Sequence, residues 1–421
     1  MRPSEKLYNQ LSSFTAKGLE LSKTMAINII AARLLGVEEY GLLNFVIAIG
    51  AILGIIAEFR VQEISIKRIA IGHDPNKVIS EALLTCLGFS TFTAAAICIA
   101  ALLNTKANWL EHVAVYSIIY IVSSLKVFKF ALLAKNSNNE IAKAEIISLA
   151  ITALATLAAW KSDFTITDYL TIRIIDILVS CSASAYLYEK KYQFKPISAR
   201  LDEIISLCKE CAPLVLSGVA IILLQKIDHV MIRYFLGDYE LGIYSAASNI
   251  LVIFCIAPML ASQTSAPLMF ATRGGASEKT QARISYIRQT LKLGLCMSAV
   301  LTCSSLYLPA FFFGERFSSA SAILLISSLT PAVIALGAAS SQIIIADNNT
   351  STIFIKSLIA LTSNTALNLT MIPIFGIEGA ALATTTALLI SNVVSNIIVK
   401  RYRYIWNLQK SAMRLGARKP S

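Results

Sequence analysis

Three basic side chains within one long apolar stretch are the first candidates for chemistry. In the stretch 204–236, Lys226, His229 and Arg233 are spaced i, i+3 and i+7, so a helix would present them on one face. Asp228 would lie about 100° away from His229 around the same helix. Charges inside a membrane-spanning helix cost roughly 2.5–3.5 kcal/mol each and normally face a protein interior or a wet cavity. The spacing therefore predicts a cationic face that lines such a cavity.

Four charged residues in two other apolar stretches lie three positions apart. Glu20 and Lys23 form one such pair, and Arg173 and Asp176 form the other. At this spacing each pair could neutralise itself across one helical turn, or its members could face the cavity separately. Both interpretations stay open at the level of the sequence.

Further basic residues lie near the ends of apolar stretches, where long side chains can reach the headgroups, and these are Arg33, Lys126 and Lys129. A cationic cavity suits an anionic solute such as a pyrophosphate group, which several Lys and Arg side chains can hold by charge-assisted hydrogen bonds. The cations predicted to contact such a solute are Lys226, Arg233, Arg173, Lys23, Lys126 and Lys129. The groups predicted to couple an ion are Asp228, Asp176, Glu20 and His229.

Apolar helices are the elements that must position these side chains. Hydrophobic residues make up 56% of the chain and charged residues 15%, whereas soluble domains carry about 25% charged residues. Apolar runs of about 20 residues, enough to cross roughly 30 Å of hydrocarbon, recur along the chain and predict an all-α integral membrane protein with about twelve spans. The predicted spans are 14–35, 42–61, 80–103, 113–134, 141–160, 169–188, 204–236, 241–261, 289–313, 320–345, 353–372 and 379–399.

The net charge of +12 is distributed unevenly along the chain. Basic residues concentrate in alternate loops and in the tail 400–421, while the opposite loops hold little more than Lys106, Lys161 and Arg316. Because positively charged loops stay in the cytoplasm, this bias predicts that both termini are cytoplasmic and that the helix count is even. The basic excess thus indicates membrane topology and contact with membrane lipids, and it does not indicate nucleic-acid binding.

Two sequence motifs occur once in each half of the chain. The first is LLGVEEYGLLN, matched by FLGDYELGIYS, in which Gly36 aligns with Gly237 at an offset of 237 − 36 = 201. The second begins at Leu132 and is matched from Ile344, at an offset of 344 − 132 = 212. Both offsets span six helices, so the halves should share one orientation and be related by a pseudo-two-fold axis along the membrane normal. The predicted organisation is two six-helix bundles, 1–195 and 196–399, and a basic cytoplasmic tail, 400–421.

Other motifs predict structure rather than chemistry. Pro213, Pro258 and Pro331 could mark bends that let two halves rock against each other. Cys208 and Cys211 form a C-x-x-C on a predicted spanning helix, without a second pair or a nearby His, which favours packing over metal binding. The sequence has no phosphate-binding loop, and its outer loops are too short for a membrane polymerase or ligase. We therefore expect a transporter without cofactor or metal rather than an enzyme.

Three segments together resemble a known family. They are the turn 34–44, the run from Gln225-x-x-Asp228 to FLGDYELGIYSAA, and NTALNLTMIPIFGIEGAALATT, which begins at Asn364. The last of these is the most specific and contains Asn368, Pro373, Gly376 and Gly379. In these segments and in length the chain resembles the polysaccharide biosynthesis exporters. They are the O-antigen flippase branch of the superfamily that also holds the multidrug and toxic-compound extruders.

The resemblance implies a flippase in the bacterial cytoplasmic membrane. It would move an undecaprenyl pyrophosphate-linked oligosaccharide outward by alternating access between two six-helix bundles, with a polysaccharide polymerase and chain-length regulators as possible partners. The chain departs from the family at Glu58-Phe59-Arg60-Val61, where Arg60 replaces a Gly and predicts a stiffer turn. The alternative is a drug or cation antiporter of the same superfamily. The acidic residues in the spans leave it open, because an organic cation needs carboxylates and aromatic faces.

Overall fold

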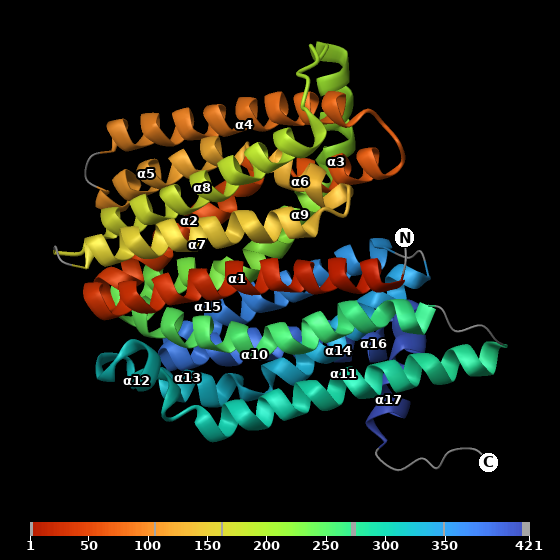
Figure 1. The fold of residues 1–421 in the computed structure, drawn as a ribbon. Helices are drawn as coiled ribbons and strands as arrows, with labels where there is room; N and C mark the ends of the chain where they lie inside the picture. The colour runs from red at the N-terminus through yellow and green to blue at the C-terminus, as the bar shows by residue number, and fades with distance from the viewer. Residues whose placement is uncertain (1–2, 105–106, 161–162, 271–274, 348–349, 415–421) are drawn as a thin grey trace. The chain divides into compact units, whose positions relative to one another are not determined.

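The computed structural model describes the chain apart from residues 1–2, 105–106, 161–162, 271–274, 348–349 and 415–421 (Figure 1). Every regular element in the described part is a helix, as predicted. Two compact units, Met1–Ile222 and Leu223–Ser421, divide the chain inside α9 (Leu201–Leu236). The predicted division after residue 195, into two six-helix bundles, stays a prediction. Lys106, Lys161 and the end of the predicted tail lie outside the described residues.

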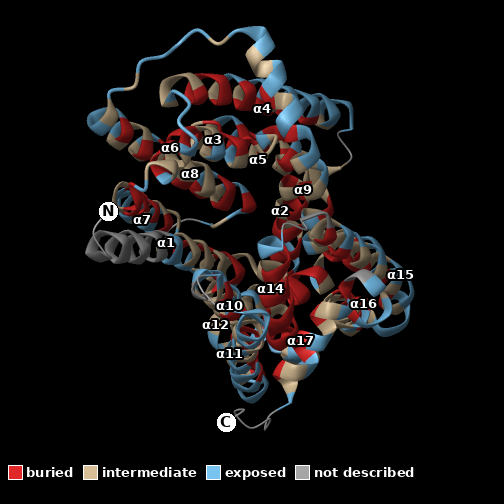
Figure 2. Cartoon of the chain, turned by 90° about the vertical axis from the view of Figure 1, so that its right-hand side faces the viewer, coloured by how far each residue is buried: buried red, intermediate tan, exposed pale blue. Residues whose placement is uncertain are grey.

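The first unit is built from long helices whose outer faces are apolar. α7 packs against both α1 and α8, while α4 packs against α2 and α5. Buried residues follow the inner faces of these helices (Figure 2). Phe92, Leu102 and Leu154 are exposed on outer faces, as expected for contact with hydrocarbon rather than water. Besides the start of α9, the helices of this unit are α1 (Pro3–Leu35), α2 (Val37–Glu58), α3 (Val61–Ala70), α4 (Pro75–Leu103), α5 (Asn108–Ser123), α6 (Lys126–Ala134), α7 (Asn138–Ala159) and α8 (Ile166–Tyr192).

In the second unit α14 packs against α10 and α11, and α17 packs against α11 and α16. Ile405 and Leu408 of α17 join a buried core with Ile287, Leu336 and Ile343. Part of the predicted basic tail is therefore a helix that belongs to the folded unit. The helices here are α10 (Asp238–Phe270), α11 (Ala276–Ser304), α12 (Leu308–Phe313), η1 (Glu315–Phe317), α13 (Ala320–Ile326), η2 (Ser327–Leu329), α14 (Thr330–Ala346), α15 (Thr350–Leu389), the π-helical turn η3 (Ile390–Val394), α16 (Ser395–Ile398), η4 (Lys400–Tyr402) and α17 (Arg403–Met413).

Two predicted spans of the first unit are broken. The second span ends at Glu58, because Phe59 and Arg60 both adopt left-handed backbone conformations with φ of 47° and 52°. The fourth is the bent pair α5 and α6, which meet at 41°. There the hydroxyls of Ser123 and Ser124 donate to backbone carbonyls of the preceding turn, a pattern that bends helices.

Proline and glycine lie inside or at the start of several helices of the second unit and inside α9. Pro213 lies inside α9 and Pro258 inside α10. Pro331 instead occupies the first turn of α14, directly after the 3-10 turn η2, where its missing N–H costs no hydrogen bond. Gly376, with φ of 63°, interrupts α15 between the last two predicted spans.

Eight helices of the described chain are long and apolar enough to cross a membrane, or nine if α5 and α6 form one span. One of them, 352–398, contains both of the last two predicted spans. α1 and α11, which hold the predicted spans 14–35 and 289–313, are not among the eight. The chain is thus a multi-pass membrane protein, while the count of twelve and the cytoplasmic side of the termini stay predictions.

Gly379 should not tolerate a side chain, because the break at Gly376 brings the carbonyl of Met371 against it. A Cβ at Gly379 would overlap that carbonyl, and overpacking costs roughly 1–3 kcal/mol. We expect Gly379→Ala to lower the unfolding temperature of the purified protein by several degrees. Gly88→Ala is the control, since its Cβ would meet nothing within 4 Å. Equal unfolding temperatures for the two variants would contradict this close approach.

Candidate functional site

A buried lysine at the centre of the first unit bonds to carboxylates from two other helices. Lys23 of α1 pairs with Glu145 of α7 at 3.0 Å and with Asp176 of α8. The side chains of Lys23 and Glu145 are only 4% and 2% exposed. α1 therefore meets the consecutive helices α7 and α8 at one ion-paired group, in which Lys23 and Glu145 lie 122 residues apart along the chain.

Hydroxyls complete the hydrogen bonding of this group. Ser148 accepts from Lys23 Nζ at 3.0 Å and donates to Asp176 Oδ1 at 2.6 Å. Ser180 donates to Glu145 Oε1 at 2.7 Å. Glu145 and Ser148 lie three positions apart on α7, and Asp176 and Ser180 lie four apart on α8, so each pair shares a helix face. Buried charges need such partners, because an unsatisfied one costs several kcal/mol.

Three further cations surround this centre and are more exposed. Lys129 pairs with Glu145 at 2.9 Å and with Glu20 at 3.5 Å. Arg173 pairs with Asp176 at 2.9 Å. Lys126 pairs with Glu58 at 2.6 Å. The exposed fractions of their side chains are 25% for Lys129, 22% for Arg173 and 32% for Lys126, and all three line a cavity of about 110 Å³ that also reaches Lys23.

The eight ionised groups of this charge cluster balance. The cations are Lys23, Lys126, Lys129 and Arg173, and the carboxylates are Glu20, Glu58, Glu145 and Asp176. With all groups ionised the formal net charge is 4 − 4 = 0. In this unit the structure thus places carboxylates beside the predicted cations, and the cavity itself is lined by four cations and three carboxylates, Glu20, Glu145 and Asp176.

The two pairings that the sequence left open differ in the structure. Arg173 and Asp176 bond across one turn of α8, as their spacing predicts. Lys23 does not pair with Glu20 but turns to α7 and α8, while Glu20 contacts Lys17 at 3.4 Å and Lys129. The site predictions omitted Glu145, although its carboxylate lies at the centre of the charge cluster. The signal available in the sequence was its spacing with Ser148 and Thr152 on one face of an apolar helix.

The predicted cationic face of α9 lies in the second unit and is partly neutralised. Arg233 pairs with Asp238 at 2.7 Å. His229 Nδ1 lies 2.8 Å from Asp228 Oδ1, and Tyr244 donates to the other oxygen of Asp228 at 2.5 Å. Asp228 and His229 are both buried, and the carboxylate of Asp228 is the hydrogen-bond partner of His229 and Tyr244.

Lys226 differs from these groups. Its side chain is half-buried, and it forms no ion pair or hydrogen bond with any residue that the structure describes. His229 and Arg233 each contact a carboxylate, whereas Lys226 contacts none among the described residues.

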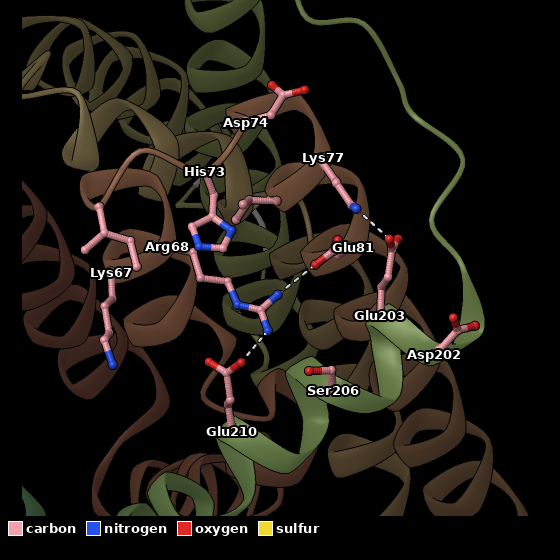
Figure 3. Close-up of a pocket in the computed structure, with 12 residues that line it drawn as sticks. Lys67, Arg68, His73, Asp74, Lys77, Glu81, Asp202, Glu203, Ser206 and Glu210 are labelled. Atoms are coloured by element: carbon pink, nitrogen blue, oxygen red, sulfur yellow. Dashed lines mark hydrogen bonds and ion pairs between the residues drawn. The ribbon is translucent and has the colours of Figure 1, made fainter.

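A larger cavity, about 490 Å³, lies between α3, α4 and the start of α9 (Figure 3). Arg68 bridges Glu81 of α4 at 2.8 Å and Glu210 of α9 at 2.6 Å. Lys77 of α4 pairs with Glu203 of α9 at 2.5 Å. Because these charges bond to one another across the cavity, we interpret it as a clamp that fixes the start of α9, and not as the solute site.

Replacing Lys23 should destabilise the protein more than replacing any exposed lysine. Lys23→Met removes the most deeply buried partner of Glu145 and Asp176 and leaves each carboxylate with one cation, Lys129 or Arg173, so the loss should approach the roughly 3–5 kcal/mol of a broken buried ion pair. Lys17→Met is the matched control, because the Lys17–Glu20 pair is exposed and contributes about 0–1 kcal/mol. Thermal unfolding in detergent should show a large decrease for Lys23→Met alone.

The double variant Lys23→Met/Asp176→Asn removes one cation and one carboxylate together. It should recover part of the stability lost by Lys23→Met, since fewer buried charges stay uncompensated. If the single variant unfolds at the temperature of Lys17→Met, the ion pairs described for Lys23 do not stabilise the fold.

Comparisons with known proteins identify the family of this chain. The family model described as polysaccharide biosynthesis protein matches residues 8–273. A putative O-antigen transporter of Shigella dysenteriae is 26% identical over 275 residues, which cover 63% of this chain and 67% of that protein. The lipid II flippase MurJ, in an inward closed conformation, superposes with a TM-score of 0.73 at 16% identity, covering 97% of this chain and 91% of that one.

A second solved structure has the same fold. An inward-facing multidrug resistance MATE family transporter of the MOP superfamily superposes with a TM-score of 0.70 at 11% identity, covering 95% of this chain and 96% of the other. At such low identities these two structures show a shared fold alone. The fold is therefore that of the MOP-superfamily transporters.

Proposed function

Because the chain belongs to the polysaccharide biosynthesis protein family, we propose that it is a flippase for a lipid-linked oligosaccharide. Its cargo would be an oligosaccharide on undecaprenyl pyrophosphate, moved outward across the bacterial cytoplasmic membrane by alternating access. The observation that carries this proposal is the charge cluster, in which three partly exposed cations line a cavity among membrane helices. Such a site suits a pyrophosphate, which binds best to several converging cationic donors.

Exchange of partners is the proposed binding step. Glu58 and Glu20 are 48% and 39% exposed, so their pairs with Lys126 and Lys129 are weak and open to solvent. An arriving pyrophosphate would replace these carboxylates on the two lysines and would accept a further hydrogen bond from Arg173. Once the cargo leaves, the carboxylates would bind the cations again and restore neutrality.

The remaining predicted residues receive distinct roles in this proposal. Lys23 is too deeply buried to meet the cargo and holds α1, α7 and α8 together. Asp176 shares that structural role. Lys226 stays a candidate for cargo contact, and Asp228 with His229 stays a candidate for ion coupling because both are ionisable and buried in a membrane helix. Cytoplasmic termini, twelve spans, and association with a polymerase and chain-length regulators complete the proposal.

Removing the partly exposed cations should stop export. In a strain that makes the cognate polysaccharide, Arg173→Gln and Lys129→Gln should each lower surface polysaccharide at least roughly tenfold and leave lipid-linked oligosaccharide accumulated inside. Lys143→Gln is the control, since Lys143 is an exposed lysine of α7 paired with Glu140 outside the cavity. All variants are compared at equal amounts in the membrane.

Normal export by both cavity variants would overturn the site assignment. The superfamily alternative, a drug or cation antiporter, makes a different prediction. Deletion of the gene would then sensitise cells to cationic dyes and leave the surface polysaccharide unchanged. That outcome would replace the flippase proposal itself.

The exchange step predicts opposite effects from the two members of one ion pair. Glu58→Gln removes the competitor of the pyrophosphate, so the purified protein should bind undecaprenyl pyrophosphate more tightly than wild type. Lys126→Gln removes a ligand and should weaken binding. A titration with the labelled carrier lipid measures both constants. Changes of the same sign in the two variants would contradict the exchange.

A further inference from the structure

A cavity of about 290 Å³ lies in the second unit between α10, α14 and the π-helical turn η3. Its polar side chains are Gln263, Ser341, Gln342 and Asn392. The rest of its lining is apolar and includes Met259, Ile334 and Ala338. None of the described residues that line this amide cavity carries a charge, which sets it apart from the charge cluster of the first unit.

The three amides of this cavity have unused hydrogen-bonding capacity. The side chains of Gln263, Gln342 and Asn392 form no hydrogen bond with the described parts of the protein. Gln263 is exposed and Gln342 and Asn392 are half-buried, so all three amides can still form hydrogen bonds with water or with a polar ligand that enters the cavity.

The backbone around Asn392 is shaped for this cavity. Asn392 lies in the π-helical turn η3, and such turns occur frequently at functional sites. Across from it, a Cβ on Gly337 would meet Asn392 Oδ1 at 2.5 Å. The absence of a side chain at Gly337 therefore allows the amide to lie directly against α14.

The internal repeat gives the amide cavity an equivalent in the first unit. At the offset of 237 − 36 = 201, Glu58 corresponds to Met259. At the offset of 344 − 132 = 212, Lys126 corresponds to Ala338. Met259 and Ala338 both line the amide cavity, so an ion pair of the first copy is replaced by two apolar side chains.

The offset of 212 also relates polar residues of the two cavities. Lys129 corresponds to Ser341 and Ser180 corresponds to Asn392. Lys129 and Ser180 line the cavity of the charge cluster, and their counterparts line the amide cavity. One position in the repeated fold thus carries charges in the first copy and neutral hydrogen-bonding groups in the second.

From these observations we infer that the amide cavity binds the neutral sugar hydroxyls of the cargo. Amides both donate and accept hydrogen bonds, as hydroxyl groups require. The apolar side chains beside them suit the C–H faces of a pyranose ring. A pyrophosphate would need cations, and an organic cation would need carboxylates, neither of which the described lining supplies.

This inference rests on the proposed function and specifies which part of the cargo each unit recognises. Gln263, Gln342 and Asn392 lie near the C-terminal ends of α10, α14 and the segment that ends at Ile398. The basic loops predict that these ends are cytoplasmic. The amide cavity would then meet the sugar on the side where the cargo loads.

The experiment compares two carrier lipids on the full-length protein, purified in a detergent without a sugar headgroup. The probes are undecaprenyl pyrophosphate alone and undecaprenyl pyrophosphate that carries one neutral hexose. The triple variant Gln263→Leu/Gln342→Leu/Asn392→Leu replaces the amides by apolar side chains of similar size. Gln281→Leu is the matched control, because Gln281 is an exposed amide on α11 outside the cavity.

Wild type and Gln281→Leu should bind the hexose-bearing carrier roughly tenfold more tightly than the bare carrier. The triple variant should bind both carriers with the affinity of the bare one. If Asn392→Leu prevents insertion, the double variant of Gln263 and Gln342 serves, since neither side chain is buried. Equal affinities in wild type, or a preference that survives in the variant, overturn the inference. A wild-type protein that binds neither carrier instead overturns the proposed function.

Discussion

The ion pairs of Lys23 with Glu145 and Asp176 are the interaction on which the first unit depends. Taking a charge out of water costs several kcal/mol even after relaxation, and only close partners recover it. Each partner here comes from a different helix, and Ser148 and Ser180 complete the hydrogen bonding. A shift of any of these helices by one turn would separate the charges. The ion pairs therefore fix how α1, α7 and α8 align along their axes.

Exposure divides the charge cluster into fixed and exchangeable parts. The central pairs lie where the dielectric constant is low, so their attraction is strong and their separation is costly. Lys126 and Lys129 reach outward to Glu58 and Glu20, which are more exposed than the lysines, and such pairs contribute little, although Lys129 also bonds to the buried Glu145. A binding site that must also release its cargo needs weak, exchangeable pairs such as those of Lys126 and Lys129. The buried central pairs keep these lysines in position while their partners change.

The sequence predicts the helices well because hydropathy is a local property. It predicts the partners of the charged side chains poorly, because those depend on packing between distant segments. Glu145 illustrates this, since its partners Lys23 and Lys129 lie 122 and 16 residues away along the chain. Lys356 was also missed, and it is buried in α15 with its ammonium donating to Asn396 at 3.0 Å. Only the structure shows that an amide oxygen, and not a carboxylate, accepts this hydrogen bond.

The predicted tail shows the same limit. Its net positive charge predicts a basic cytoplasmic tail, but the apolar spacing of Ile405 and Leu408 places one face of α17 in the core of the second unit. Gln409 of the same helix is fully buried, and its side-chain amide donates a hydrogen bond to the hydroxyl of Ser340 at 2.9 Å. Composition could not reveal this docking, because the deciding contacts come from these three residues among many basic ones.

The two units stabilise their buried polar groups in different ways. The first uses opposite charges, and the second uses mostly amides, such as the chain from Gln409 through Asn396 to Lys356. An amide network offers both donors and acceptors and so accommodates hydroxyls, whereas an ion-pair network can exchange one anion for another. A cargo with an anionic end and a neutral end is matched by that difference. A duplicated fold whose copies had kept identical chemistry would be suited to only one end.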